Sequence, residues 1–535
     1  MDAGGQVSVG LENVATAGDV TVADAIATAA IRAGVDTVFG VGGTHTLPLL
    51  AALQRAGLRY VPARGELGAG YMGIGYARVA GRPAMVLTST GPGALSVTPA
   101  LQDAVWSSLP LLHVTSTVSG VGFSGTVHET PNQHEILRLA GKSAVTIAAS
   151  TAAAEMRRAV ELTRTGPPGP VTVEVPVSAW AEPTPPPQAD AVAVDECRRD
   201  AGAIETILEA LKTARRPVVY VGGGALRGDG GAAALELACR LGAPVVTSHP
   251  GKPIAAWDHP SYIGPWATEP DVREALGAAD VAIVLGSKLS TLGSSAWQLP
   301  FPEPTFRVTL DDRPHLHYPN LRAIIGDAPR TAEAITAAIN AREPWLDVPA
   351  LTRAVLNQKR EEYPNELEFV ETLARCTAAP RRFSGDMCKA AFWVMKFMGA
   401  VHGAVHAFSG YMAMGSGLPG AVGMAVADGD PVLALIGDGG LQMSLAELAT
   451  VAELGLPITM VVVADGAYGL LRDNAPDPDV VPGLNLWNPD LGALLASYGM
   501  PVASVSNPLD LATALQADVD GPRAIVTTQT FSRRW

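Results

Sequence analysis

An aspartate between glycines stands out in the C-terminal part of the chain, in the stretch "IGDGG" at residues 436–440. It follows the apolar run "PVLAL", which predicts a buried parallel strand. In open parallel sheets, ligands bind outside the carboxyl ends of the strands. Gly437, Gly439 and Gly440 would let backbone amides approach such a ligand, and the following helix would offer its N-terminus to an anion. Asp438 would repel a phosphate unless a divalent cation lay between them, so the stretch indicates a diphosphate with Mg²⁺.

A second carboxylate follows the next apolar run, "PITMVVVADGAYG", which places Asp465 at the next strand end. The carboxyl ends of parallel strands meet at one edge of a sheet, so Asp438 and Asp465 are expected at the same edge. Mg²⁺ is typically held by one or two carboxylates together with phosphate oxygens. The alternative for Asp438 alone is an ordinary turn aspartate, because "GDG" is a common sequence. The second acid and the intervening strand–helix–strand frame favour the metal site.

The predicted elements around these acids alternate in the order strand, turn, helix and strand. This order occurs in three segments of the chain. In the first segment, Thr21 and Asp24 form a capping box at the start of a helix, and Gly34 is suited to its end. Another helix is expected from Glu66 to Val79. The alternation predicts three doubly wound parallel-sheet α/β domains. The expected divisions are a tail (1–19), a first domain (20–182), a Pro-rich linker (183–199), a central domain (200–342), a second linker (343–365) and a third domain (366–535).

The composition excludes several classes of protein. Of 535 residues, 48% are hydrophobic and 17% charged, and no apolar run reaches the roughly 18 residues of a membrane-spanning helix. The net charge of −14 argues against nucleic acid and anionic membranes as partners. The acidic, glycine-rich N-terminus does not have the pattern of a signal peptide. The cysteines show no metal or disulfide spacing, so a reduced, cytoplasmic chain is expected; they are Cys197, Cys239, Cys376 and Cys388.

Taken together, the motifs resemble those of the thiamine-diphosphate-dependent enzymes, and the acetolactate-synthase-like members in particular. "GDGG…ADGAYG" is similar to the family's cofactor motif, and "ARGELGAGYMGIGYARVAGRPAMVLTSTGPG" is similar to its pyrimidine-binding domain. "VGGG" and "LDDRPHLHYPN" resemble its central domain, and "MAMGSGLPGAVGMAVADGDPVLALIGDGG" its diphosphate-binding domain. The resemblance covers nearly the whole chain. It implies thiamine diphosphate and Mg²⁺ as cofactors, whereas the FAD that some relatives hold in the central domain has no support in these residues.

The family holds Mg²⁺ with two side chains and one carbonyl, which implies Asp438, Asp465 and the backbone carbonyl of Ala467 here. The sequence departs from the family at Ala464, where an Asn usually stands, and at Asp465, where many members have Asn. Met414 matches the apolar side chain that wedges between the two rings of the cofactor, with an ordinary core methionine as the alternative. The other cofactor contacts that the resemblance implies are Met412, Gly437, Gly439, Gly440, Tyr468 and Gly469.

Three residues match positions that carry catalysis in the family. Glu66, in "ARGELGAG", matches the glutamate that bonds the pyrimidine N1′ and so promotes loss of the thiazolium C2 proton; the alternative is a glutamate favoured by the helix dipole. His45, in "VGGTHTLP", and His128, in "GTVHETP", are candidates for proton transfer to the substrate. Benzaldehyde lyase and cyclohexanedione hydrolase are similar in having a histidine in the loop of His45. Either histidine could instead be a solvated loop residue.

The resemblance implies an enzyme that decarboxylates a 2-oxo acid and joins the product to a second carbonyl. A plain decarboxylase and an acyloin C–C lyase like benzaldehyde lyase are the alternatives, and a catalytically silent cofactor-binding protein is the alternative from another class. In the family, the pyrimidine domain of one subunit caps the diphosphate domain of another. A homodimer or homotetramer that binds small 2-oxo acids or aldehydes is therefore expected.

Overall fold

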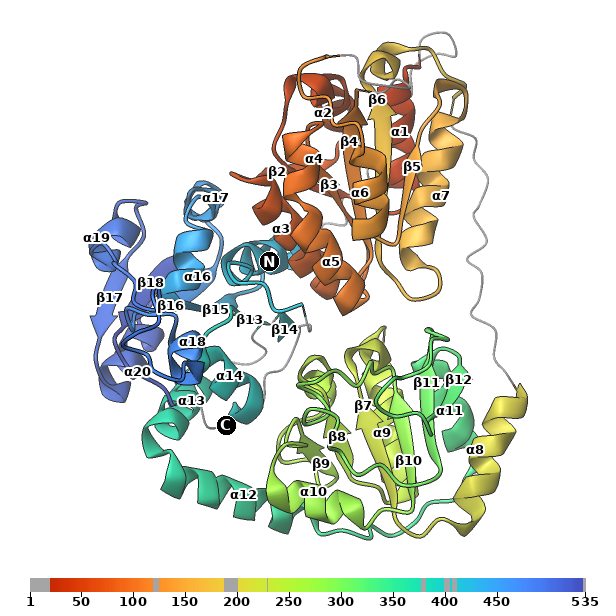
Figure 1. Cartoon of the computed structure of the whole chain (residues 1–535), viewed down its shortest axis with the longest axis vertical. Helices are drawn as coiled ribbons and strands as arrows, with labels where there is room; N and C mark the ends of the chain where they lie inside the picture. Colours follow the sequence, from red (N-terminus) through yellow and green to blue (C-terminus); the bar gives the residue numbers. More distant parts are fainter. Residues whose placement is uncertain are drawn as a thin grey trace, which may run out of the picture. The chain divides into compact units, whose positions relative to one another are not determined.

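The computed structural model describes residues 20–118, 125–186, 201–228, 230–376, 382–398, 405–406 and 411–532. These residues form three parallel sheets of six strands each, so the predicted architecture of three α/β domains is confirmed (Figure 1). The tail predicted at 1–19, most of the linker predicted at 183–199 and Cys197 lie outside the described residues. The chain divides into two compact units: the first contains the first sheet and the second contains the other two.

The first sheet has the strand order β2-β1-β3-β4-β6-β5. Its strands are β1 (Thr37–Gly40), β2 (Arg59–Pro62), β3 (Ala84–Leu87), β4 (Leu111–Thr117), β5 (Ser143–Thr146) and β6 (Pro170–Pro176). Its α-helices are α1 (Val22–Arg32), α2 (Leu47–Arg55), α3 (Glu66–Ala80), α4 (Pro92–Ser96), α5 (Thr98–Ser107), α6 (Gln133–Ala140) and α7 (Ala152–Arg164). The predicted capping box is present at α1, where Asp24 N–H donates to the Thr21 hydroxyl at 3.3 Å.

The central sheet has the order β12-β11-β10-β7-β8-β9. Its strands are β7 (Pro217–Val221), β8 (Val245–Thr247), β9 (Tyr262–Gly264), β10 (Val281–Leu285), β11 (Thr305–Thr309) and β12 (Arg322–Ile325). Its α-helices are α8 (Ala201–Thr213), α9 (Gly230–Leu241), α10 (Pro270–Gly277) and α11 (Ala328–Ala338). Strands β7, β8, β10 and β11 are buried along their whole length, because helices cover both faces of a doubly wound sheet.

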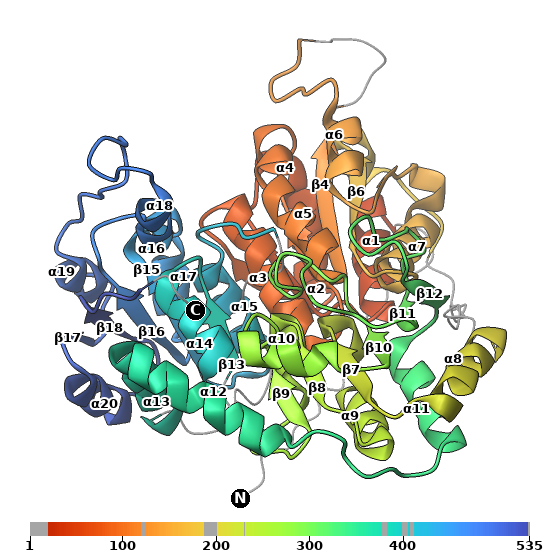
Figure 2. The same ribbon diagram turned by 60° about the horizontal axis from the view of Figure 1, so that its bottom comes forward.

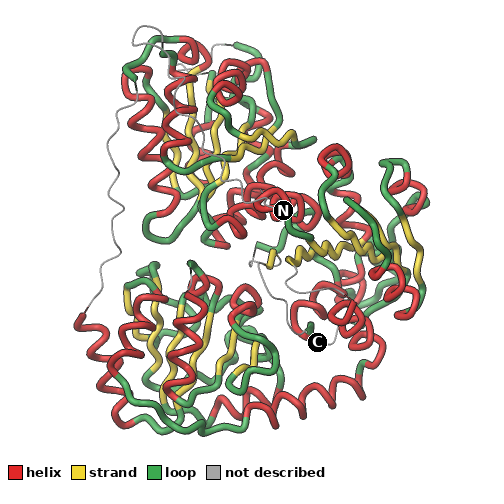
Figure 3. Tube along the Cα trace, turned by 180° about the vertical axis from the view of Figure 1, so that it is seen from behind, coloured by secondary structure: helices red, strands yellow, loops and turns green. Residues whose placement is uncertain are grey.

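The third sheet has the order β14-β13-β15-β16-β18-β17, with helices on both of its faces (Figure 3). Its strands are β13 (Arg382–Gly385), β14 (Val405–His406), β15 (Val432–Gly437), β16 (Ile458–Val463), β17 (Val502–Val505) and β18 (Arg523–Thr527). Its α-helices are α13 (Pro364–Cys376), α14 (Lys389–Phe397), α15 (Gly417–Asp428), α16 (Asp438–Met443), α17 (Glu447–Leu454), α18 (Gly469–Asn474), α19 (Leu491–Ala496) and α20 (Pro508–Gln516). No helix within the described residues combines the length and apolar character needed to cross a membrane.

The stretch predicted as a linker at 343–365 contains a regular helix, α12 (Val348–Glu362), which contacts α10 and α13 (Figure 2). Asp347 caps its N-terminus by accepting a hydrogen bond from the Ala350 amide at 2.9 Å. One continuous hydrophobic cluster joins residues of the central sheet to residues of the third sheet. This shared core explains why the two sheets belong to one compact unit.

Buried lysines add polar contacts to this shared core. The Lys252 ammonium donates to the backbone carbonyls of Val394 and Met395 at the end of α14, at 3.0 and 2.8 Å. Burial lowers the pKa of Lys252 from its ordinary 10.5 to about 7. Nearby, the carboxylate of Glu269, which is 3% exposed, pairs with Lys396 at 2.5 Å and with Lys359 at 3.2 Å. The second compact unit therefore depends on charged partners as well as on apolar packing.

Candidate active site

Strands β15 and β16 are neighbours in the third sheet, and an aspartate follows the end of each. Gly437 of β15 pairs in register with Val463 of β16, so Asp438 and Asp465 leave the sheet at the same edge. Asp438 is the first residue of α16 and is 1% exposed, whereas Asp465 is half-buried in the loop after β16. The structure thus brings together the two carboxylates that the sequence pairs.

Three donors surround the Asp438 carboxylate. Its Oδ1 accepts from the Gly439 amide at 2.8 Å, and its Oδ2 accepts from the Gly466 amide at 2.8 Å. Asn488 donates its side-chain amide to the same Oδ2 at 2.6 Å. Hydrogen bonds to a carboxylate are among the strong ones, so the three donors hold the Asp438 side chain in one orientation.

Asp465 lies in a more repulsive environment. Burial raises its pKa, the charge of Asp438 raises it further, and the Lys389 ammonium opposes both effects. Lys389 is 7% exposed and pairs with Asp473 of α18 at 3.2 Å. Gly469 lies beside both groups, because a Cβ there would be 2.7 Å from Asp465 Oδ2 and 2.8 Å from Lys389 Cε.

These residues fit Mg²⁺, because a divalent cation between two neighbouring carboxylates would offset their mutual repulsion. Along the described ranges, no cluster of three or more His, Cys, Asp and Glu side chains has the geometry of a metal site. Mg²⁺ does not need one, since it takes several ligands from water and substrate phosphates. Asp438 and Asp465 would supply the side-chain ligands, and the carbonyl of Ala467 remains the predicted third.

The glycines around Asp438 are needed for packing. A Cβ on Gly439 would lie 2.7 Å from the ring of Tyr468, and a Cβ on Gly440 would lie 2.7 Å from Oδ1 of Asp386. The loop that carries Ala467 and Tyr468 is held by the segment 484–486, because the Tyr468 amide donates to the Leu484 carbonyl at 2.8 Å. The predicted cofactor contacts are therefore fixed by close backbone packing on two sides.

Asp386, directly after β13, anchors the segment that carries the predicted methionine wedge. Its carboxylate is 1% exposed and accepts from the amides of Gly415 at 3.1 Å and Gly417 at 2.9 Å. Burial raises the pKa of Asp386, while the backbone donors lower it. Met414 immediately precedes the anchored Gly415 and is half-buried, and Met412 has a left-handed φ of 58°. The buried aspartate therefore sets the path of the backbone on which both methionines lie.

The three predicted catalytic residues belong to the first compact unit. Glu66 begins α3, and a Cβ on Gly93 would lie 3.1 Å from Glu66 Oε1, so the first turn of α4 passes close to this carboxyl group. The rings of His45 and His128 meet edge to face, with centroids 5.6 Å apart. The structure brings the two histidines into contact, although they are far apart in sequence.

The backbone around the histidines is unusual. His128 has a φ of 67°, a left-handed conformation that non-glycine residues rarely adopt. Its carbonyl packs against Gly91, where a Cβ would lie only 2.4 Å from the oxygen. The Ser116 hydroxyl, at the end of β4, donates to the carbonyl of His45 at 3.0 Å. Strain of this kind is retained where the surrounding structure enforces it, and it is typical of functional sites.

Sequence reasoning missed three polar residues around Asp438, Asp465 and the methionine segment: Asn488, Asp386 and Lys389. Asp386 had a detectable signal, since "RFSGD" repeats the pattern of a short strand followed by an acid. Asn488 had none, because it is a loop residue that reaches Asp438 from 50 positions away. Lys389 was hidden in an apolar helix whose pattern predicts only a buried element.

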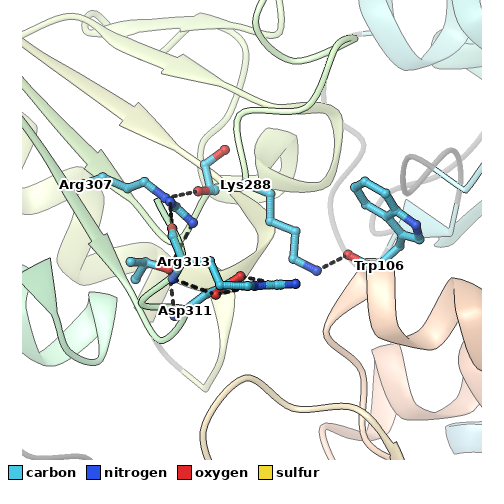
Figure 4. A network of polar contacts seen from close by, with 7 residues as sticks. Trp106, Lys288, Arg307, Asp311 and Arg313 are labelled. Atoms are coloured by element: carbon cyan, nitrogen blue, oxygen red, sulfur yellow. Dashed lines mark hydrogen bonds and ion pairs between the residues drawn. The ribbon is translucent and has the colours of Figure 1, made fainter. Parts of the chain in front are cut away.

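The central sheet carries its own polar network at the carboxyl ends of β10 and β11 (Figure 4). Arg313 donates to both oxygens of Asp311, at 2.8 and 2.6 Å, and this pairing lowers the pKa of Asp311. Arg307 is 5% exposed and donates to the Ser287 carbonyl at 3.4 Å. The arginines of this network are therefore engaged by groups of the same domain.

Comparison with known proteins places this geometry in a family. Residues 20–138 match the model described as "Thiamine pyrophosphate enzyme, N-terminal TPP binding domain". Residues 204–335 match the central domain of the same enzymes, and residues 386–527 match the C-terminal TPP binding domain. Asp438 and Asp465 fall within the third match, and Glu66, His45 and His128 fall within the first.

Curated relatives and solved structures agree with these matches. A "Probable 2-ketoarginine decarboxylase" of Pseudomonas aeruginosa is 32% identical over 89% of this chain and 88% of its own length. An acetolactate synthase of Mycobacterium bovis is 27% identical over 85% of this chain and 77% of its own. A thiamine diphosphate-dependent 4-hydroxybenzoylformate decarboxylase of Rhodococcus jostii RHA1 has the same fold, with a TM-score of 0.83 over 96% of this chain and 100% of that one at 22% identity. The chain therefore belongs to the acetolactate-synthase-like family of thiamine diphosphate-dependent enzymes.

Proposed function

We propose that this chain is a thiamine diphosphate- and Mg²⁺-dependent enzyme that decarboxylates a 2-oxo acid and then protonates the carbon that has lost carbon dioxide. The observation that carries the proposal is the contact between the rings of His45 and His128, in the same compact unit as Glu66. Imidazoles exchange protons near neutral pH, so an adjacent pair suits delivery of a proton to a substrate carbon.

The roles of the residues follow from their chemistry. When bound, thiamine diphosphate supplies an electron sink for the electron pair left by departing carbon dioxide. Asp438 and Asp465 would hold Mg²⁺, and through it the diphosphate. Glu66 would share a proton with the pyrimidine N1′, and His45 or His128 would donate a proton to the substrate.

The first substrate to test is 2-ketoarginine, a 2-oxo acid with a cationic guanidinium group. The support for it is the relative of Pseudomonas aeruginosa, which shares 32% identity over 89% of this chain. Purified protein with cofactor and Mg²⁺ would be incubated with 2-ketoarginine, pyruvate and an aromatic 2-oxo acid. Carbon dioxide release would be measured, and the products would be identified by mass spectrometry. An aldehyde one carbon shorter than its 2-oxo acid is the expected product.

A second candidate is carboligation, in which the decarboxylated fragment is joined to another carbonyl compound. It is supported by the acetolactate synthases among the relatives, at 27% identity for that of Mycobacterium bovis. Adding an acceptor aldehyde to the same incubations separates the two candidates, because acyloin products would then replace the aldehyde. If no 2-oxo acid in the panel released carbon dioxide, both candidates would be rejected.

A further inference from the structure

Gln133, the first residue of α6, makes four hydrogen bonds with a side chain that is 3% exposed. Its oxygen accepts from the Gly91 amide at 2.8 Å and from the Thr90 hydroxyl at 3.2 Å. Its nitrogen donates to the Ser116 carbonyl at 3.0 Å and to Glu174 Oε1 at 2.8 Å. Every donor and acceptor position of this buried amide is therefore used.

The groups that Gln133 joins are those that hold the two histidines. Gly91 packs directly against the backbone of His128. Ser116 binds the Gln133 amide through its carbonyl and the carbonyl of His45 through its hydroxyl. One side chain thus connects the supports of both imidazoles, which come from loops more than eighty positions apart in sequence.

Glu174 and His134 fix the direction in which the Gln133 amide points. Glu174 is 1% exposed, and its Oε2 lies 2.6 Å from Nδ1 of His134. A carboxylate only accepts hydrogen bonds, so Gln133 must turn its nitrogen toward Glu174 and its oxygen toward the Gly91 amide. An inverted amide would place its donors against the Gly91 N–H, which would leave buried groups unsatisfied.

We propose that Gln133, oriented by Glu174 and His134, is a positioning residue that sets the placement of His45 and His128 relative to each other. The expected effect of Gln133 on turnover rests on the proposed function, whereas its effect on the placement of the two histidines does not. Small misplacements of groups that act on substrate cost up to about a hundredfold in rate. None of the four hydrogen bonds of the amide involves Glu66, so the amide would act on turnover through the histidines.

The test compares Gln133→Met with Gln102→Met, a matched control. Gln102 is also a glutamine on the first sheet's helices, and it donates to the carbonyls of Leu139 and Ala140 at the other end of α6. The first readout needs no activity: the rate at which diethylpyrocarbonate modifies each histidine, followed by peptide mass spectrometry. Gln133→Met should change the rates at both His45 and His128 by at least about threefold, and Gln102→Met should change neither. Unchanged rates in Gln133→Met would overturn the inference, whatever the enzyme's activity.

The second readout separates positioning from general damage. Gln133→Met should lower kcat by about 10- to 100-fold, while C2 proton exchange of the bound cofactor stays within about threefold of wild type. If Gln133→Met folds poorly, Glu174→Gln replaces it in the test. This variant keeps the volume of the side chain but no longer fixes the orientation of the Gln133 amide, and it should lower kcat by a smaller factor than Gln133→Met. A parallel fall of C2 exchange and kcat in both variants would show a role in folding alone and overturn the inference. The two proposals can also fail separately. If the rates of diethylpyrocarbonate modification change as expected but the protein decarboxylates no 2-oxo acid, the proposed function is rejected and the positioning role of Gln133 is retained.

Discussion

Replacing Asp438 by asparagine tests the metal site most directly, because the structure defines what the substitution removes. The carboxylate accepts three hydrogen bonds, from Gly439 at Oδ1 and from Gly466 and Asn488 at Oδ2. Asparagine has a single acceptor oxygen, so its NH₂ group must face at least one of these donors. If the oxygen keeps the two bonds at Oδ2, the Gly439 amide loses its acceptor. A hydrogen bond to a charged group contributes about 1.5 to 3 kcal/mol of free energy, which is the scale of the loss expected here.

The same substitution removes one negative charge from the predicted Mg²⁺ ligands. The expected result is a fall of about 10- to 100-fold in the affinity for thiamine diphosphate at low Mg²⁺. Part of that loss should be recovered at high Mg²⁺, because mass action restores occupancy of a weakened metal site. The measurement is a titration of the apoprotein with cofactor by isothermal calorimetry, at several fixed Mg²⁺ concentrations.

Asp430→Asn provides the control at the opposite end of β15. Its carboxylate is half exposed and pairs with Arg382 at 3.1 Å, and a surface pair of this kind contributes about 1 kcal/mol or less. This variant should bind the cofactor like the wild type at every Mg²⁺ concentration. If Asp438→Asn also bound like the wild type at low Mg²⁺, the assignment of Asp438 as a metal ligand would be wrong.

The remaining predictions concern catalysis, stability and assembly. Glu66→Gln should slow C2 proton exchange by about 10²- to 10⁴-fold. It should leave the diphosphate anchoring nearly intact, so cofactor affinity should fall much less than in Asp438→Asn, which quenched-exchange NMR and calorimetry would check. Glu269→Gln should leave the buried Lys396 without its carboxylate partner, while Lys359 keeps Glu362, and should destabilise the second unit by about 3 to 5 kcal/mol, measured by urea denaturation. Lys252 loses its proton near pH 7 when folded and near 10.5 when unfolded, so between these values the unfolded chain binds more protons and the free energy of unfolding rises with pH. The contribution of Lys252 to this slope is at most about 1.4 kcal/mol per pH unit, so the slope should be smaller by up to that amount in Lys252→Met. Activity should sediment with a dimer or a larger species, and a fully active monomer would contradict the expected assembly.

Local signals in the sequence predict the frame of the site well. The Thr21–Asp24 capping box and the acids after "PVLAL" and "MVVV" depend on residues within a few positions of one another, so they can be identified without the fold. Residues 343–365 were predicted as a linker because the stretch is highly charged. In the structure few side chains of helix α12 are buried, so its sequence shows little apolar periodicity. Its charged partner Glu269 comes from a distant loop, which no pattern in 343–365 could indicate.

The contacts that orient the candidate site residues depend on pairs far apart in sequence. Asn488 reaches Asp438 across 50 positions, and Gln133 reaches Gly91 across 42. Hydrogen bonds of this kind leave no periodicity and no spacing in a single chain. The sequence therefore predicts which strand ends carry chemistry, and only the fold identifies the amides that hold them.

The first and third sheets have the same strand order. Counted from the first strand of each domain, both sheets read 2-1-3-4-6-5, whereas the central sheet reads 6-5-4-1-2-3. The two sheets therefore have the same topology. The ends of the third and fourth strands are equivalent places in the two domains, occupied by Asp438 and Asp465 in the third domain. In the first domain, the Gln133 amide links the turn after the third strand to Ser116 on the fourth. One topology thus carries opposite chemistry at the same place: a pair of acids in the third domain, and a neutral, fully bonded amide in the first.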